Sequence, residues 1–127
     1  MIRHSAWVCV LAMVMPVVAV AQFSVPATKA TPESMFRNQC ATCHTLSAAE
    51  PRRQGPPLAG VIGRRAGTSP GFKYSPGFAN ADFVWDAGHL DTYLTNPQSM
   101  IPGAVMPYRQ ANADTRHAII SYLETQR

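Results

Sequence analysis

Lysine is scarce in this chain of 127 residues, where Lys29 and Lys73 are the only lysines among 11 basic side chains. The formal net charge is +4, and removal of an N-terminal segment containing Arg3 leaves a mild positive excess. The chain has no dense basic run beyond the pairs Arg52–Arg53 and Arg64–Arg65, so nucleic-acid binding is a poor interpretation. A mild positive charge instead favours acidic partners or surfaces.

The sequence also lacks an apolar run long enough to span a bilayer, which takes about 20 residues. The N-terminal run VCVLAMVMPVVAV is shorter and is interrupted by Pro16. It follows a positive start at Arg3 and precedes the small residues AVA, a pattern typical of a cleaved secretory signal. We therefore expect residues 1–21 to be a signal peptide cleaved after Ala21, with export to a bacterial periplasm. A retained membrane anchor is the alternative.

Sustained strand patterns are absent as well. Residues 47–80 are dense in glycine and proline and have neither the alternation of a strand nor the period of a helix, so long loops are expected there. The chain is too short for two hydrophobic cores. We expect residues 22–30 to form a flexible leader and residues 31–127 to form one small domain.

Three helices are expected, in an all-α fold. The first begins at the cap candidate Thr31 and closes with the cysteine motif described below. The second runs from its cap Asp86 to a stop at Pro97, and the third covers residues 112–126, with Arg116 facing outward. These helices and loops make too thin a core for an exported domain of this size, so we expect them to wrap around a cofactor.

Only three cysteines are present, and two of them, Cys40 and Cys43, are followed by His44 in the motif CATCH. A zinc site would need a second pair of ligands, whereas the mature chain offers only the isolated His89 and His117. A thioredoxin-like redox pair would need a βαβ context, and a plain disulfide would not require His44. The remaining interpretation is covalent haem attachment, for which C-x-x-C-H is the sequence signal.

The spacing of this motif suits a porphyrin. At a helix end, positions 40 and 43 share one face, where both thiols can add to the vinyl groups along one haem edge. His44 then places its imidazole beneath the iron as the proximal ligand. We therefore expect one haem c, attached through Cys40 and Cys43, to complete the core.

The residues alone leave the second axial ligand open. The candidates in the mature chain are Met35, Met100, Met106, His89, His117 and Lys73. Met35 shares a helix with Cys40 and cannot reach the opposite haem face, and the two histidines lie among polar neighbours typical of a solvated surface.

Both remaining methionines lie in the loop NPQSMIPGAVMPY. Pro107 forces Met106 into an extended conformation, and Gly103 permits close approach of the backbone to a flat cofactor. These features favour Met106 over Met100 without excluding Met100.

The chain resembles the class I cytochromes c, in particular the small soluble type of mitochondria and α-proteobacteria. The resemblance rests on CATCH, GPPLAGVIGRRAG, PGFKYS, Trp85, YLTNP and IPGAVMPY, which recur in that order. It runs from Cys40 to about Tyr108 without a gap and, with the flanking helices, covers nearly all of the mature chain. It implies the small cytochrome c fold, with three main helices and long loops wrapped around one covalently bound haem.

The resemblance also implies roles for individual residues. Met106 ends the Pro-Gly-x-x-Met element and is implied to be the distal ligand, with Tyr93 hydrogen-bonding near its sulfur. Pro56 is implied to present its backbone carbonyl to the other ring nitrogen of His44, which fixes the tautomer. The positions implied to hold the buried haem propionate are Tyr74, Trp85 and Arg64.

Some positions depart from the family pattern. Phe78 stands where an asparagine is common, and Ala104 stands where a threonine is common. Both make the pocket less polar, which favours the ferrous iron and predicts a positive, somewhat raised reduction potential. Gln39 and Val105 stand where many relatives have docking lysines, so the partner is expected to differ from the usual oxidase.

The function implied by the resemblance is that of a periplasmic one-electron carrier between respiratory or dehydrogenase partners. The expected protein is a monomer and not an enzyme, and its donor and acceptor are redox proteins in membrane or periplasmic complexes. Two alternatives stay open: a haem enzyme or gas or peroxide sensor with a labile distal ligand, and a tightly bound electron-accepting subunit of an exported dehydrogenase.

Overall fold

The computed structural model describes residues 29–127, so the expected signal peptide and most of the expected leader lie outside the described residues. The helices in this part of the chain are α1 (Pro32–Gln39), the 3-10 helix η1 (Pro76–Asn80), α2 (Ala87–Thr95), α3 (Pro97–Met100) and α4 (Ala113–Glu124). Over the same residues the only β contact outside helices is an isolated antiparallel bridge between Arg65 and Val84. The expectation of an all-α domain with long loops is confirmed.

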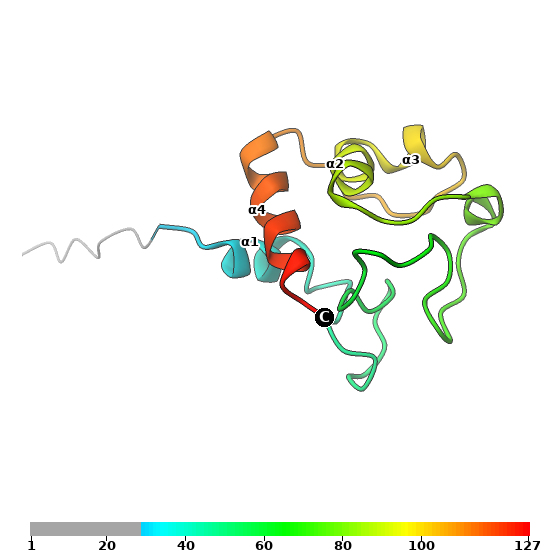
Figure 1. Ribbon diagram of the computed structural model, residues 1–127, viewed down its shortest axis with the longest axis horizontal. Coiled ribbons are helices and arrows are strands. Elements are labelled where there is room, and N and C mark those ends of the chain that lie inside the picture. The colour runs from blue at the N-terminus through cyan, green and yellow to red at the C-terminus, as the bar shows by residue number, and fades with distance from the viewer. Residues whose placement is uncertain (1–28) are drawn as a thin grey trace, which may run out of the picture.

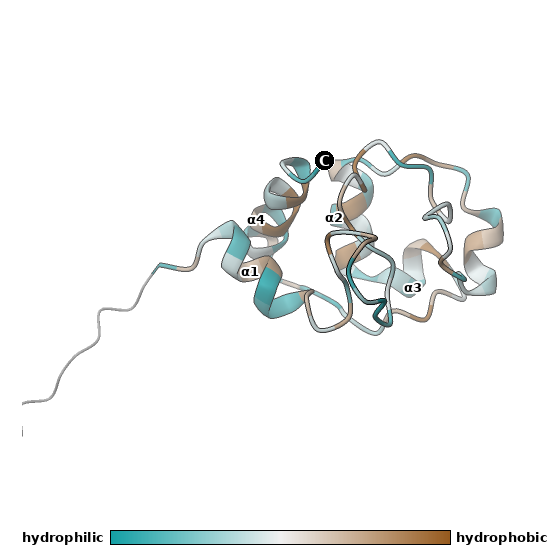
Figure 2. Cartoon of the chain, turned by 90° about the horizontal axis from the view of Figure 1, so that it is seen from below, coloured by the Kyte–Doolittle hydropathy of each residue, from teal (hydrophilic) through white to brown (hydrophobic). Residues whose placement is uncertain are grey.

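Helices α1 and α4 pack against each other, and α4 also contacts α2 (Figure 1). At the first contact the rings of Phe36 and Tyr122 lie 5.1 Å apart, centroid to centroid. Ile119 and Leu123, on the same side of α4, are buried. Figure 2 shows both hydrophilic and hydrophobic residues in α1 and α4, as expected for helices with one face in the core. Among residues 29–127, no helix has the length and apolar character needed to cross a membrane.

Helix α1 begins where the sequence predicts and ends earlier. The Thr31 hydroxyl accepts a hydrogen bond from the Ser34 amide at 3.1 Å, and the Ser34 hydroxyl accepts one from the Thr31 amide at 2.8 Å. This reciprocal cap fixes the first turn, with Pro32 at its first position. The prediction that the helix includes the cysteine motif was wrong, because α1 ends at Gln39, Cys40 forms its C-cap and the motif continues as a turn.

Helix α2 is capped by Asp86, as predicted, since its carboxylate accepts the His89 amide at 2.7 Å. Its apolar face is also as expected, with Leu90, Tyr93 and Leu94 buried. The predicted stop at Pro97 is confirmed, because α2 ends at Thr95 and Asn96 forms its C-cap. The short helix α3 that follows was not predicted. The Asn96 side chain accepts the Ser99 amide at 3.4 Å and caps α3, which Pro97 opens.

Arg116 was predicted to face outward and is in fact buried. Its Nε lies 2.7 Å from Oδ1 of Asp91 on α2, and its side chain is only 11% exposed. The prediction failed because a cation on a helix is ordinarily solvated, and only the packing of α4 on α2 supplies the carboxylate that makes burial of the charge favourable.

Candidate functional site

The cysteine motif forms a tight turn directly after α1. The His44 amide donates to the Cys40 carbonyl at 2.9 Å, and the Cys43 amide donates to the same carbonyl at 3.1 Å. Neither Cys40 nor Cys43 is in a disulfide. Burial, and then the neighbouring Cys43, raises the pKa of the Cys40 thiol to about 11, so this sulfur is protonated at neutral pH. The turn therefore presents two free thiols and one imidazole from five consecutive residues.

The His44 ring is held in one tautomer. Its Nδ1 lies 2.8 Å from the Pro56 carbonyl oxygen. Because a carbonyl can only accept, Nδ1 carries the proton and Nε2 keeps a free lone pair. Burial lowers the pKa of His44, and the hydrogen bond to Pro56 offsets only part of that effect. The ring is therefore neutral at physiological pH, which is the state that binds a metal ion.

Gly55 lies against the same ring, and sequence reasoning missed its role. A Cβ at this position would lie 2.2 Å from Cε1 of His44. The Gly55 amide donates to the Cys43 carbonyl at 2.7 Å, which holds the loop against the cysteine turn. Only glycine permits this approach, and the signal available in the sequence was its place directly before the Pro56–Pro57 pair.

Aromatic side chains from three segments form a cluster. The ring centroids of Trp85 and Tyr93 lie 5.1 Å apart, and Phe78 lies 4.8 Å from Tyr74 and 6.2 Å from Tyr93. Burial, and then the neighbouring Tyr74, raises the pKa of Tyr93 to about 12, so its hydroxyl remains a hydrogen-bond donor. The structure thus brings together Tyr74, Trp85 and Tyr93, three of the residues singled out from the sequence.

Arg64 connects this cluster to the histidine loop. Its guanidinium donates to the Pro57 carbonyl at 2.9 Å and also to the Ala59 carbonyl. Its own backbone carbonyl accepts the Trp85 amide at 2.9 Å. Arg64 is thus half-buried between the segment that orients His44 and the segment that carries Trp85.

Two serine hydroxyls that sequence reasoning missed flank Tyr74. The Oγ atoms of Ser69 and Ser75 are buried and have no hydrogen-bond partner within residues 29–127. The Ser69 amide also donates to the Tyr74 hydroxyl at 3.2 Å. Buried hydroxyls without a partner are costly, and the two carboxylates of a haem are acceptors that such hydroxyls can satisfy. Together with two free thiols, a neutral imidazole and an aromatic wall, these residues fit a haem.

The segment 101–110, here called the distal strap, contains Met106. Met106 is half-buried and packs against the hydrophobic core, as does Met100 on α3. Gly103 has φ +87°, and its Cβ position would be 3.3 Å from the Gly77 backbone, so the strap crosses η1 at close range. The Gln98 side chain, also missed by sequence reasoning, donates to the Met106 carbonyl at 2.6 Å.

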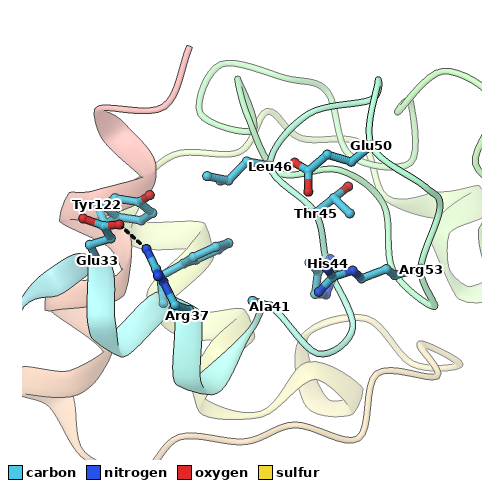
Figure 3. A pocket seen from close by; sticks show the side chains of 10 residues that line it. Glu33, Arg37, Ala41, His44, Thr45, Leu46, Glu50, Arg53 and Tyr122 are labelled. Atoms are coloured by element: carbon cyan, nitrogen blue, oxygen red, sulfur yellow. Dashed lines mark hydrogen bonds and ion pairs between the residues drawn. The ribbon is translucent and has the colours of Figure 1, made fainter.

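A cavity of about 160 Å³ borders His44 on the side of α1 and α4 (Figure 3). Its charged lining side chains are Glu33, Arg37, Glu50 and Arg53. The volume is below the roughly 300–1,000 Å³ of pockets that hold drug-sized ligands, so this cavity is too small for a haem. In residues 29–127, no group of three or more histidine, cysteine, aspartate and glutamate side chains converges as a metal site would require.

The chain is similar to known proteins over most of its length. The Cytochrome c family model matches residues 32–127. The chain is 38% identical over 93 residues to cytochrome c of Sesamum indicum, covering 72% of this chain and 84% of that protein. It is 37% identical over 95 residues to cytochrome c2 of Rhodomicrobium vannielii, covering 74% of this chain and 75% of the relative.

A solved structure shows the same fold. The ferricytochrome c2 of Rhodopseudomonas palustris superimposes with a TM-score of 0.69 at 34% sequence identity, covering 76% of this chain and 96% of the other. The resemblance noted in the sequence is thereby confirmed. The chain belongs to the cytochrome c family, whose members bind one haem c covalently through a C-x-x-C-H motif.

Proposed function

We propose that this protein is a periplasmic one-electron carrier whose haem iron is ligated by His44 and Met106. The observation that carries the proposal is the 2.8 Å hydrogen bond from His44 Nδ1 to the Pro56 carbonyl, which leaves Nε2 of a neutral ring free to bind iron. When bound, the haem supplies a one-electron ferrous–ferric couple. The coarser statement, a haem-based electron carrier, follows from membership in the family.

The protein's own residues keep the site constant while the charge changes. Cys40 and Cys43 would hold the cofactor through two thioether links, and the hydrogen bond to the Pro56 carbonyl raises the basicity of His44. Met106 offers a soft sulfur, which favours the ferrous state. Tyr93, with its pKa near 12, remains a donor that can hydrogen-bond near this sulfur.

We assign the binding of the buried haem carboxylate to the polar side chains around Tyr74. Tyr74, Trp85 and Arg64 are the positions that the resemblance implies, and the hydroxyls of Ser69 and Ser75, which have no hydrogen-bond partner within residues 29–127, lie on either side of Tyr74 along the chain. These side chains would replace water as hydrogen-bond donors to the carboxylate. His44 and Met106 would both bind the iron and so would leave no position for another ligand, which suits electron transfer without bond making.

The partners are proposed to be redox proteins that dock transiently, with this chain acting as a monomer. Such interfaces are small and wet, and they allow fast turnover. The N-terminal pattern, which predicts a signal peptide cleaved after Ala21, supports the proposed periplasmic location.

The visible spectrum of purified holoprotein, with and without carbon monoxide, tests this function. A low-spin spectrum with sulfur-to-iron absorption and no response to the gas is expected. Met106→Leu should abolish the sulfur band and admit carbon monoxide, whereas Met100→Leu, the matched control from the same chain region, should keep the band. Prompt gas binding by the wild-type protein would instead support the enzyme or sensor alternative.

A further inference from the structure

The distal strap is fastened to the rest of the molecule at both ends. At its start, Gly103 packs on the Gly77 backbone. At its end, the Tyr108 hydroxyl donates to the Gln39 side chain at 3.2 Å, and the Gln110 amide donates to the Leu94 carbonyl at 2.8 Å. Met106 lies between these two anchored ends. The position of Met106 therefore depends on the contacts made by the middle of the strap.

Few contacts of its own backbone and side chains hold the middle of the strap in place. Pro107 has no amide hydrogen to donate, and Val105 is 79% exposed, which shows that its side chain packs on little. Within residues 29–127, neither the Ala104 carbonyl nor the Met106 carbonyl accepts a backbone hydrogen bond. Their donor is Gln98 on α3, whose Nε2 lies 2.6 Å from the Met106 carbonyl oxygen and 3.4 Å from that of Ala104.

The orientation of the Gln98 amide is itself fixed. Its Oε1 accepts a hydrogen bond from Nη2 of Arg109 at 3.1 Å. Because a guanidinium can only donate, it selects the amide oxygen and leaves the NH₂ group facing the two carbonyls. The helix that contains Gln98 is packed against the core, since Pro97 before Gln98 is fully buried and Ile101 after α3 is buried.

We propose that Gln98 is a positioning residue for the distal ligand. It fixes the Met106 carbonyl and so restricts the strap movements that would withdraw the methionine sulfur from the iron. Arg109 acts one step further out, by holding the Gln98 amide in the orientation that can donate. The proposal rests on the proposed function, in which Met106 binds the iron, and it assigns to Gln98 the control of how often that bond opens.

The rate at which cyanide binds the ferric holoprotein tests this assignment, because an external ligand can enter only when the sulfur has left. Gln98→Met keeps the side-chain length and removes the donor. It should raise the rate about three- to tenfold, the factor expected from one hydrogen bond of ordinary net strength. Gln98→Glu keeps an acceptor for Arg109 but turns oxygens towards two carbonyls, so a larger increase is expected.

Two further variants complete the series. Arg109→Met should give a smaller increase than Gln98→Met, because it releases the amide without removing it. Ser99→Ala is the matched control on α3, because its exposed side chain does not touch the strap carbonyls, and its rate should stay within about twofold of the wild type.

The outcomes separate this inference from the proposed function. If the wild-type protein shows no sulfur-to-iron band, Met106 is not the ligand and the proposed function fails with it. If the wild type has the band but Gln98→Met binds cyanide at the wild-type rate, only the present proposal is overturned. A lowered unfolding midpoint with an unchanged cyanide rate also overturns it, since Gln98 then stabilises the fold and not the ligand bond.

Discussion

Arg116 and Asp91 form an ion pair that joins α4 to α2, with Nε 2.7 Å from Oδ1 and Nη2 3.4 Å from Oδ2. The remaining group of the same guanidinium, Nη1, donates to the carbonyls of Gln110 and Ala111, both at 2.9 Å. One side chain therefore ties together two helices and the end of the distal strap.

Replacement of Arg116 by Met keeps the aliphatic stem and removes these donors. It leaves one carboxylate and two carbonyls without their partner, so we expect the free energy of unfolding to fall by about 2–3 kcal/mol. Denaturant unfolding of the holoprotein measures the change. The exposed Arg127 gives the matched control Arg127→Met, which should be nearly neutral. A loss for Arg116→Met no larger than that of the control would contradict the prediction.

The same pair predicts a pH dependence of stability. The hydrogen bond from Arg116 holds the pKa of Asp91 below its ordinary value of 3.8. A lowered carboxyl pKa contributes stability above the ordinary pKa, and this contribution is lost as the pH falls through the lowered value. The stability difference between wild type and Asp91→Asn should therefore be constant from neutral pH down to about pH 4 and shrink below it. A difference that does not change with pH would be inconsistent with this account.

Substitution of Gly55 by Ala should disturb the haem ligand directly. The new Cβ would lie 2.2 Å from the His44 ring, so the ring or the loop must shift. We expect the free energy of unfolding to fall by about 1–3 kcal/mol and the visible spectrum of the haem to change. A loss of stability caused elsewhere in the protein would not change the spectrum. In the control Gly88→Ala the Cβ makes only an ordinary 3.5 Å contact with Asp86, and higher helix propensity should make this variant neutral or slightly stabilising. An unchanged spectrum in Gly55→Ala would show that the ring is not held by this contact.

A polar substitution at Phe78 should change the reduction potential of the haem. It lies between Tyr74 and Tyr93 in the aromatic cluster. Phe78→Asn adds a polar group, which stabilises the more highly charged ferric state, so the potential should fall. A difference of about 1 kcal/mol corresponds to roughly 40 mV for a one-electron couple.

Redox titration of the holoprotein measures this shift. Val84→Asn, at an exposed position outside the cluster, should leave the potential nearly unchanged. The wild-type potential itself is expected to be positive. A clearly negative wild-type potential, or a higher potential in Phe78→Asn, would refute the prediction that Phe78 and Ala104 raise the potential by making the pocket less polar.

Processing of the N-terminus can be read directly. Expression of the full chain in a bacterium that matures c-type cytochromes should yield a soluble periplasmic protein whose first residue is Gln22, as N-terminal sequencing or intact mass would show. Holoprotein that starts at Met1 and stays with the membrane fraction would establish the anchor alternative.

The fold class and the haem-attachment motif could be predicted because both depend on residues that are close together in the sequence. The cysteine motif occupies five consecutive residues, and the caps Thr31 and Asp86 each act on an amide three residues ahead. A buried cofactor was expected because the chain between the helices is too rich in glycine and proline to supply a core. The choice of Met106 came partly from Pro107, again a neighbour in sequence.

The sequence by itself therefore determined the class of protein, the haem-attachment motif and the starts of α1, α2 and α4, because each depends on residues within a few positions of one another. Only the tertiary structure decided that Arg116 is buried, that Gly55 lies on the His44 ring and that Gln98 faces the Met106 carbonyl. These contacts join residues between 8 and 25 positions apart. Their partners are set by how α2, α3, α4 and the loops pack, and no local pattern of hydrophobicity or spacing records that packing.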